Sequence, residues 1–177
     1  LPSILPKAVC VSEIGLDFKY AQNEEDKDFQ REILARQFEL AAQFRLPVQL
    51  HSRRAERQAM EEAIAFKKRY GLPSLLHWFT HSKKLLRITN EKGIFVSVGP
   101  SVLYDSHTEA VVRGIDLRYL LLETDCPVRI GGKENEVSNV VRVAEKVSQI
   151  HKISLKELSE RLRENLHCYL GSISPKE

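Results

Sequence analysis

The sequence predicts an α/β fold built of parallel βα units, and two regularities support this prediction. Short apolar runs alternate with longer amphipathic segments along the whole chain, as they do where strands are joined by crossover helices. The runs are rich in branched residues and mostly lack period-two alternation, which is typical of strands buried on both faces. We expect five strands, at residues 8–11, 46–50, 74–76, 94–98 and 119–122.

Helical periodicity fills most of the gaps between these runs. Apolar side chains spaced three and four apart predict helices over residues 29–44, 60–67, 85–88 and 137–150. Gly71 and Gly93 are suitable C-terminal stops for the second and third of these helices. A weaker helical pattern covers residues 103–112. Ser154 and Glu157 form a capping box that would open a last helix, ending at Gly171.

Five strands are fewer than the eight of a closed (β/α) TIM-type barrel. The only methionine is Met60, so we expect further residues before Leu1. We therefore interpret residues 1–177 as a single partial barrel domain that covers about five of the eight βα units. The alternation of strands and helices is also compatible with an open sheet, but the placement of polar residues favours the barrel.

The composition is that of an ordinary globular protein, with 42% hydrophobic and 29% charged residues. No apolar run has the length that a membrane-spanning helix needs. The net charge of +3 is too small to identify a partner. The three cysteines, Cys10, Cys126 and Cys168, show no paired spacing, so we expect a reducing compartment, the cytoplasm. The sequence does not indicate an oligomeric state.

Four polar residues share one location relative to the predicted strands. Each stands where an apolar run ends: Glu13, His51, His77 and Asp125. In a parallel barrel these strand ends open onto one face, where active sites are assembled. Two imidazoles and two carboxylates suit Zn²⁺, Mn²⁺ or a similar divalent ion. A single histidine after a strand is more often structural, but four such residues at strand ends favour a metal site.

Glu123 adds a second carboxylate two residues before Asp125. Strand residues two apart point to the same face, so we expect both carboxylates to project together. The two negative charges would then repel each other, and a bound cation would remove this conflict. The alternative is that Glu123 caps a loop or pairs with a nearby arginine.

Several segments resemble the signature segments of the TatD family of deoxyribonucleases, and they occur in the same order. They are residues 13–17 (Glu-Ile-Gly-Leu-Asp), 47–53, 77–80 and 121–127, and residues 131–139 resemble the stretch that follows the last strand. The resemblance implies a metal-dependent hydrolase with a (β/α) barrel, which binds one or two divalent ions (Zn, Mg or Mn). Its substrate would be DNA, cleaved at phosphodiester bonds.

The resemblance also implies roles for individual residues. Glu13 would be a carboxylate able to bridge two metal ions, and His51 and His77 would be metal ligands. Asp125 would hold the metal and the attacking water, and Glu123 would be a further catalytic carboxylate. Arg53 could bind a phosphate oxygen of the substrate through its forked donors, although a salt bridge to a nearby acid is the alternative.

Two features depart from the family pattern. Family members begin with a His-x-His motif, but none of the six histidines here precedes Glu13. We expect this motif in the residues before Leu1. His81 replaces a small residue after the 77–80 segment.

The sequence therefore predicts a metal-dependent deoxyribonuclease. A barrel hydrolase that cleaves amides, esters or lactones is one alternative, because metal-activated water serves all of these reactions. A truncated, non-catalytic relative that acts as a binding or structural protein is the other. Metal analysis of the isolated protein would separate this last alternative from the two enzymes.

Overall fold

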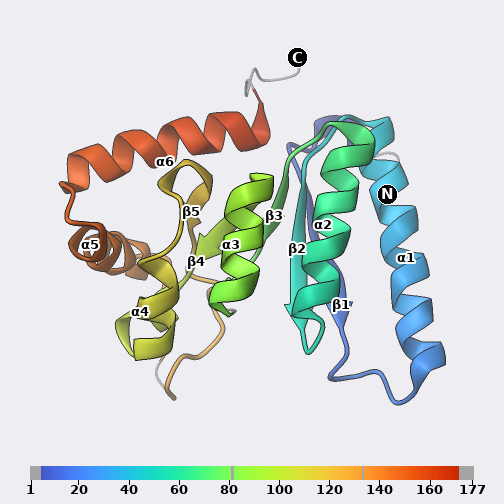
Figure 1. The fold of residues 1–177 in the computed structure, drawn as a ribbon, viewed down its shortest axis with the longest axis horizontal. Helices are drawn as coiled ribbons and strands as arrows, with labels where there is room; N and C mark the ends of the chain where they lie inside the picture. The colour runs from blue at the N-terminus through green and yellow to red at the C-terminus, as the bar shows by residue number, and fades with distance from the viewer. Residues whose placement is uncertain (1–4, 81, 133, 172–177) are drawn as a thin grey trace. The chain divides into compact units, whose positions relative to one another are not determined.

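The computed structural model describes residues 5–80, 82–132 and 134–171. The chain divides into two compact units, the first made of residues 1–77 and 167–177 and the second of residues 78–166. Strands and helices alternate in both units (Figure 1). The predicted α/β class, with the parallel strands of a TIM-type barrel, is thereby confirmed, and the barrel is not closed in the described residues. That residues 1–177 form one domain stays a prediction.

Short connections join most of the elements, and a longer one, residues 123–138, joins β5 to α5. Those of the first unit are η1 (Leu5–Lys7), β1 (Val11–Asp17), α1 (Glu24–Gln43), β2 (Val48–Arg53), α2 (Glu56–Tyr70) and β3 (Ser74–Leu76). Those that follow are α3 (Lys83–Lys92), β4 (Phe95–Val98), η2 (Pro100–Leu103), α4 (Ser106–Val112), η3 (Leu117–Tyr119), β5 (Leu120–Leu122), α5 (Asn139–His151) and α6 (Leu155–Leu170).

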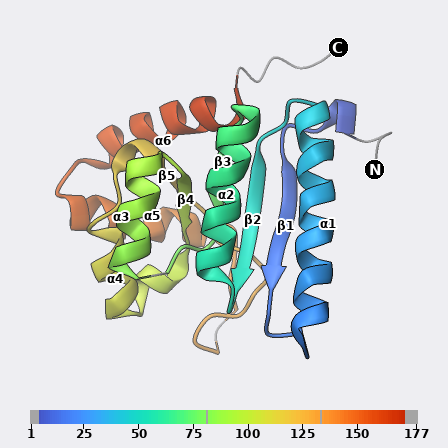
Figure 2. The same cartoon turned by 45° about the vertical axis from the view of Figure 1, so that its right-hand side comes forward.

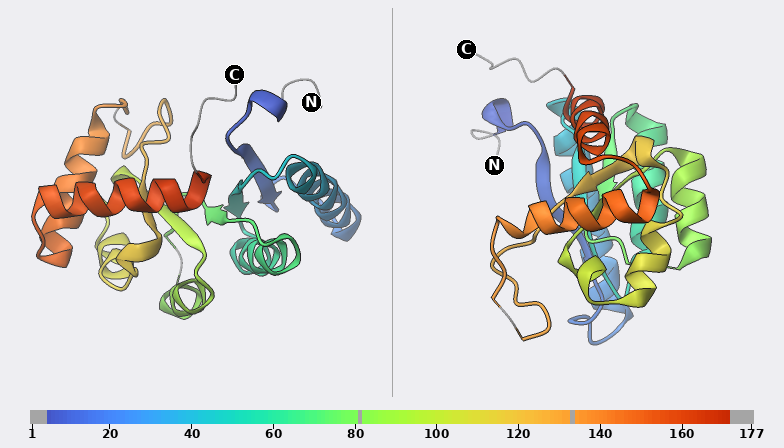
Figure 3. Two further views of the ribbon diagram at one scale, coloured as in Figure 1. Left: turned by 90° about the horizontal axis from the view of Figure 1, so that it is seen from above. Right: turned by 90° about the vertical axis from the view of Figure 1, so that its left-hand side faces the viewer.

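In the first unit, β2 pairs in parallel with both β1 and β3. Figure 2 shows β1 and β2 side by side, with their carboxyl ends at the same edge. The view from above in Figure 3 places α1 and α2 on the same side of these two strands. Ile14 and Leu16 of β1 and Leu50 of β2 are buried. The alternate residues of β1 and β2 are therefore available for a site on the other face.

In the second unit, β4 and β5 pair in parallel, with Val96 opposite Leu120 and Val98 opposite Leu122. The α6 side chain of Asn165 is buried, and its Nδ2 donates hydrogen bonds to the carbonyl oxygens of Leu117 (2.6 Å) and Leu120 (2.7 Å). These two bonds fix the entry into β5, because a buried carbonyl group needs a donor.

Helix ends follow the predicted signals closely. Gly71 and Gly93 terminate α2 and α3 in the left-handed conformation, with φ of 67° and 61°. The Ser154 Oγ accepts a hydrogen bond from the Glu157 backbone N–H at 3.1 Å. This is the hydrogen bond that the serine side chain contributes to a capping box at the start of α6. The weaker helical prediction over residues 103–112 is corrected: Asp105 caps α4, which begins only at Ser106.

Two expectations about the strands were wrong. The first strand begins at Val11 and runs to Asp17, whereas the apolar run had placed it at residues 8–11. Its buried residues alternate with Glu13, Gly15 and Asp17, so β1 carries the period-two pattern of a strand with one open face. Burial on both faces holds for β3 and β4 but not for β1 and β2.

The apolar stripe predicted on the first helix is only partly buried. Leu34, Phe38 and Ala41 of α1 pack into the core, but Phe29 and Ile33 are exposed. Spacing alone identifies the stripe, whereas the neighbouring elements decide how much of its width is covered.

Candidate metal centre

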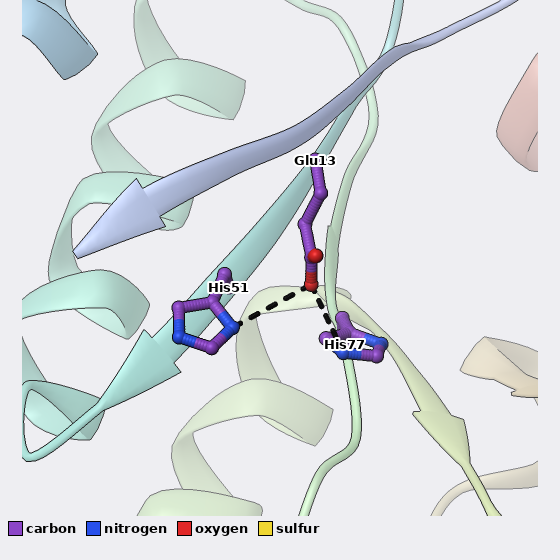
Figure 4. A group of neighbouring side chains, drawn as sticks. All are labelled: Glu13, His51 and His77. Atoms are coloured by element: carbon purple, nitrogen blue, oxygen red, sulfur yellow. Dashed lines mark ion pairs between the residues drawn. The ribbon is translucent and has the colours of Figure 1, made fainter. Parts of the chain in front are cut away.

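Glu13 lies inside β1, at the point where the pairing of β1 with β2 changes register between Val11 and Ile14. Bulges of this kind occur next to active sites, where they change the direction of a side chain. The side chain of Glu13 is 40% exposed and extends toward two histidines (Figure 4). The carboxylate is thus presented on the open face of the strand.

His51 and His77 come from the next two strands along the chain. His51 lies in β2, and His77 directly follows β3, where its backbone N–H donates to the Leu50 carbonyl oxygen at 3.0 Å. The Glu13 Oε1 atom is 2.9 Å from His77 Nε2 and 3.6 Å from His51 Nδ1 (Figure 4). The structure therefore brings together three of the four residues that the strand-end pattern had selected.

The three side chains fit a divalent cation. One oxygen and two nitrogen atoms lie within 4.8 Å of one another, and such a mixed set suits Zn²⁺, Mn²⁺ and related ions. The His77 side chain is almost fully buried, whereas 35% of the His51 side chain is exposed. The group borders a cavity of about 400 Å³, which is lined by Glu13, Ile14, Gly15, Asp17, Gln30, Ile33 and His51. A ligand thus has access to the centre.

Gly15 lets β1 approach His51. It pairs with His51 in the β1–β2 register, and its φ is 148°, a value that side chains rarely allow. A Cβ atom added to Gly15 would lie 2.1 Å from the His51 carbonyl oxygen. The glycine of the Glu-Ile-Gly-Leu-Asp segment is therefore required by the close contact between the two strands.

Asp17 is a site residue that the residue-by-residue prediction missed. Its Oδ2 atom is 3.3 Å from His51 Nε2, on the side of the ring away from Glu13. Strand periodicity could have identified it, because residues 13, 15 and 17 lie on the same face of a strand. The prediction overlooked this signal since it ended the first strand before Glu13.

Asp125 and Glu123 belong to the second unit, and both lie beyond the end of β5. Asp125 has a φ of 53°, so the strand alternation that was expected to align the two carboxylates does not apply. The Glu123 Oε1 atom accepts a hydrogen bond from the Trp78 backbone N–H at 2.7 Å. Whether Glu123 and Asp125 take the expected catalytic and metal-binding roles stays a prediction.

The buried Asn135 forms hydrogen bonds with the residues immediately before and after Asp125. The Asn135 Nδ2 donates to the Thr124 carbonyl oxygen at 2.5 Å, and the Cys126 thiol donates to the Asn135 carbonyl oxygen at 3.1 Å. Asn135 belongs to the segment after the last strand, which the sequence singled out without assigning it a role. It holds the backbone on which the Asp125 carboxylate depends.

Arg53 is the last residue of β2 and is exposed. Within residues 5–80, 82–132 and 134–171, its guanidinium forms no ion pair, so the expected alternative of a salt bridge is not found there. His81, the second departure from the family pattern, lies outside the described residues. None of the described helices has the length and apolar character that crossing a membrane requires.

Comparison with known proteins adds independent evidence. The family model described as TatD related DNase matches residues 4–171. The chain is 30% identical over 168 residues to the uncharacterized metal-dependent hydrolase YabD of Bacillus subtilis, covering 90% of this chain and 64% of that protein. It is 31% identical over 163 residues to the deoxyribonuclease TATDN3 of Homo sapiens, covering 90% and 58%. The chain thus spans less than two thirds of these relatives.

Solved structures show the same fold. The crystal structure of the TatD homologue YJJV from Escherichia coli superposes with a TM-score of 0.80 at 25% identity, over 95% of this chain and 69% of that one. A TatD family hydrolase from Entamoeba histolytica superposes with a TM-score of 0.79 at 22% identity, over 94% and 64%.

Proposed function

The chain belongs to the TatD-related DNase family, and from this premise we propose that it is part of a metal-dependent deoxyribonuclease. The observation that carries the proposal is the group formed by Glu13 of β1, His51 of β2 and His77, which directly follows β3. The substrate would be DNA, and the reaction would be hydrolysis of a phosphodiester bond. Deoxyribonucleases and metal-dependent hydrolases among the relatives support this choice.

Glu13, His51, His77 and Asp125 would hold one or two divalent ions, namely Zn²⁺, Mn²⁺ or Mg²⁺. Imidazole nitrogen favours Zn²⁺, and carboxylate oxygen is accepted by all three ions. When bound, such an ion supplies Lewis-acid activation of water and draws charge from the phosphoryl oxygens. Glu13 is suited to a central position because its Oε1 atom is the one that faces a ring nitrogen of both histidines.

The remaining residues would orient the reactants. Asp125 would orient the attacking water and accept its proton, because a carboxylate within hydrogen-bond reach can act as a general base. Glu123 would be a further catalytic carboxylate, and its Oε1 atom accepts a hydrogen bond from the Trp78 backbone N–H. The exposed guanidinium of Arg53 would bind a non-bridging phosphate oxygen, since its forked donors match phosphate geometry.

The proposal is tested by purifying the protein encoded by the complete reading frame and assaying it for DNA cleavage with Mg²⁺, Mn²⁺ or Zn²⁺. We expect His51→Ala and Asp125→Asn to abolish cleavage. His107→Ala is the matched control, because His107 is exposed on α4 and should leave the rate unchanged.

The outcomes separate the parts of the proposal. Normal cleavage by both site variants would refute the assigned residues. Metal binding without DNA cleavage would retain the metal centre and refute the substrate, so that amides, esters and lactones become the substrates to assay. Absence of bound metal together with absence of hydrolysis would identify a non-catalytic relative.

We also propose that the enzyme works in the cytoplasm. Cys10, Cys126 and Cys168 are all free thiols, which persist in a reducing compartment. Labelling the natural protein in fractionated cells would test this assignment, and recovery outside the cytoplasm would refute it.

A further inference from the structure

We propose that Asp17 is a positioning residue, which fixes the ring of His51 so that its Nδ1 atom is available to the cation. This inference rests on the proposed metal centre and adds to it a residue that binds no metal itself. It concerns only the first unit, in which both residues lie.

The two nitrogen atoms of His51 face two different carboxylates of β1. His51 Nδ1 is 3.6 Å from the Glu13 Oε1 atom, and His51 Nε2 is 3.3 Å from the Asp17 Oδ2 atom. The glycine that pairs with His51, Gly15, lies between these two acidic residues. Both carboxylates that face the His51 ring thus belong to β1. One ring nitrogen is directed toward the proposed metal centre and the other toward Asp17.

Asp17 is itself fixed in place. Its backbone N–H donates to the Gln30 Oε1 atom at 2.8 Å, and its carbonyl oxygen accepts from the Gln30 Nε2 atom at 2.9 Å. Its second carboxylate oxygen, Oδ1, accepts from the Lys19 backbone N–H at 3.0 Å. These three bonds orient the carboxylate so that Oδ2 is directed at His51.

The consequence is a choice of tautomer. A neutral imidazole carries one N–H group, and the hydrogen bond made by one nitrogen decides which nitrogen remains as the metal ligand. An ionised Asp17 carboxylate has no proton to donate and can only accept hydrogen bonds. It therefore favours the tautomer that carries the N–H at Nε2 and leaves the lone pair at Nδ1. Carboxylates that hold ligating histidines in this way contribute about 10–100-fold to metal affinity.

The first measurement needs no metal. In the apo protein with ¹⁵N-labelled histidine at pH ~8, where free imidazole is neutral, ring nitrogen shifts report the tautomer of each histidine. The signal of His51 is the one that disappears in His51→Ala. We expect the Nε2–H tautomer in the wild type and a mixture of tautomers in Asp17→Ala.

The second measurement titrates the apo protein with Zn²⁺ and with Mn²⁺ by calorimetry, without DNA. We expect Asp17→Ala to bind about 10–100-fold more weakly. Asp17→Asn should be intermediate, since its amide oxygen can still accept from Nε2 in a side chain of the same shape. Asp28→Asn is the matched control, because Asp28 is an exposed α1 residue paired with Arg31.

The inference is overturned if Asp17→Ala and Asp17→Asn keep the tautomer of the wild type and bind both metals as tightly. A wild type that binds no metal would refute the proposed function, whereas the ring spectra of the apo protein would still decide the role of Asp17. Circular dichroism checks that each variant is folded, and Asp17→Asn keeps the comparison valid if the alanine variant unfolds.

Discussion

At the scale of single residues, the proposed centre depends on a glycine as much as on the residues proposed as its ligands. Gly15 stands between Glu13 and Asp17 on β1 and contacts His51 on β2. Its φ of 148° is unfavourable for any other residue, and its missing side chain leaves room for the neighbouring backbone. The Glu-Ile-Gly-Leu-Asp segment therefore combines two carboxylates with the backbone geometry that lets them reach one histidine.

Gly15→Ala should weaken both stability and metal binding. The backbone conformation alone costs about 1–3 kcal/mol for a residue with a side chain, and the added Cβ would meet the His51 carbonyl oxygen at 2.1 Å. Urea unfolding measures the first effect, and metal titration measures the second.

Gly71→Ala is the control for this substitution. Gly71 also has a positive φ, 67°, but no atom lies within 4 Å of an added Cβ. We expect a loss of about 1 kcal/mol from the left-handed conformation and unchanged metal affinity. Equal effects of the two substitutions on metal binding would show that the contact with His51 is unimportant.

At the scale of elements, the residues immediately before α5 and α6 differ in how they cap the start of the helix. The serine before α6, Ser154, accepts a hydrogen bond from the Glu157 backbone N–H. The serine before α5, Ser138, forms no such cap, and its hydroxyl is 3.1 Å from the Glu136 carboxylate. Two serines at equivalent positions thus have different structural roles, which provides a matched pair of variants.

Ser154→Ala should lower the free energy of unfolding by about 1 kcal/mol, because a backbone N–H at the start of α6 loses its acceptor. Ser138→Ala should change it by less than about 0.5 kcal/mol, as is usual for a surface substitution. Urea unfolding of the two variants and the wild type gives the comparison. A loss at Ser138 as large as that at Ser154 would contradict the assigned caps.

At the scale of the whole molecule, the chain consists of two compact units made from the same alternation of strand and helix. The expectation of one domain over residues 1–177 can be tested by its cooperativity. A single cooperative domain unfolds in one transition, in which all probes change together.

We expect urea unfolding followed by Trp78 fluorescence and by far-ultraviolet circular dichroism to give one midpoint. Trp78 is the only tryptophan and lies in the second unit, whereas circular dichroism reports the helices of both units. Two steps in circular dichroism, of which fluorescence follows only one, would show that the units unfold separately. The midpoints should be compared at two protein concentrations, since a shift would reveal association.

Most elements were predictable because their signals are local. Glycine stops α2 and α3 at Gly71 and Gly93, and the serine cap opens α6, since a helix end needs donors or acceptors from its own neighbouring residues. His77 was predictable for a related reason, because parallel strands bring their ends to one edge. Glu13 and His51 were selected by the same rule, although the structure places them inside β1 and β2. The limits of β1 were not, because alternation around Gly15 was less conspicuous than the apolar run before it.

The sequence by itself determined the α/β class, the order of the elements and the residue types able to hold a divalent ion, since these follow from periodicity and from side-chain chemistry. The tertiary structure alone decided which nitrogen of His51 faces Glu13 and which faces Asp17. It also decided that Glu123 accepts from the Trp78 backbone. Contacts of this kind depend on strand register and ring orientation, which join residues far apart in the chain and leave no local pattern.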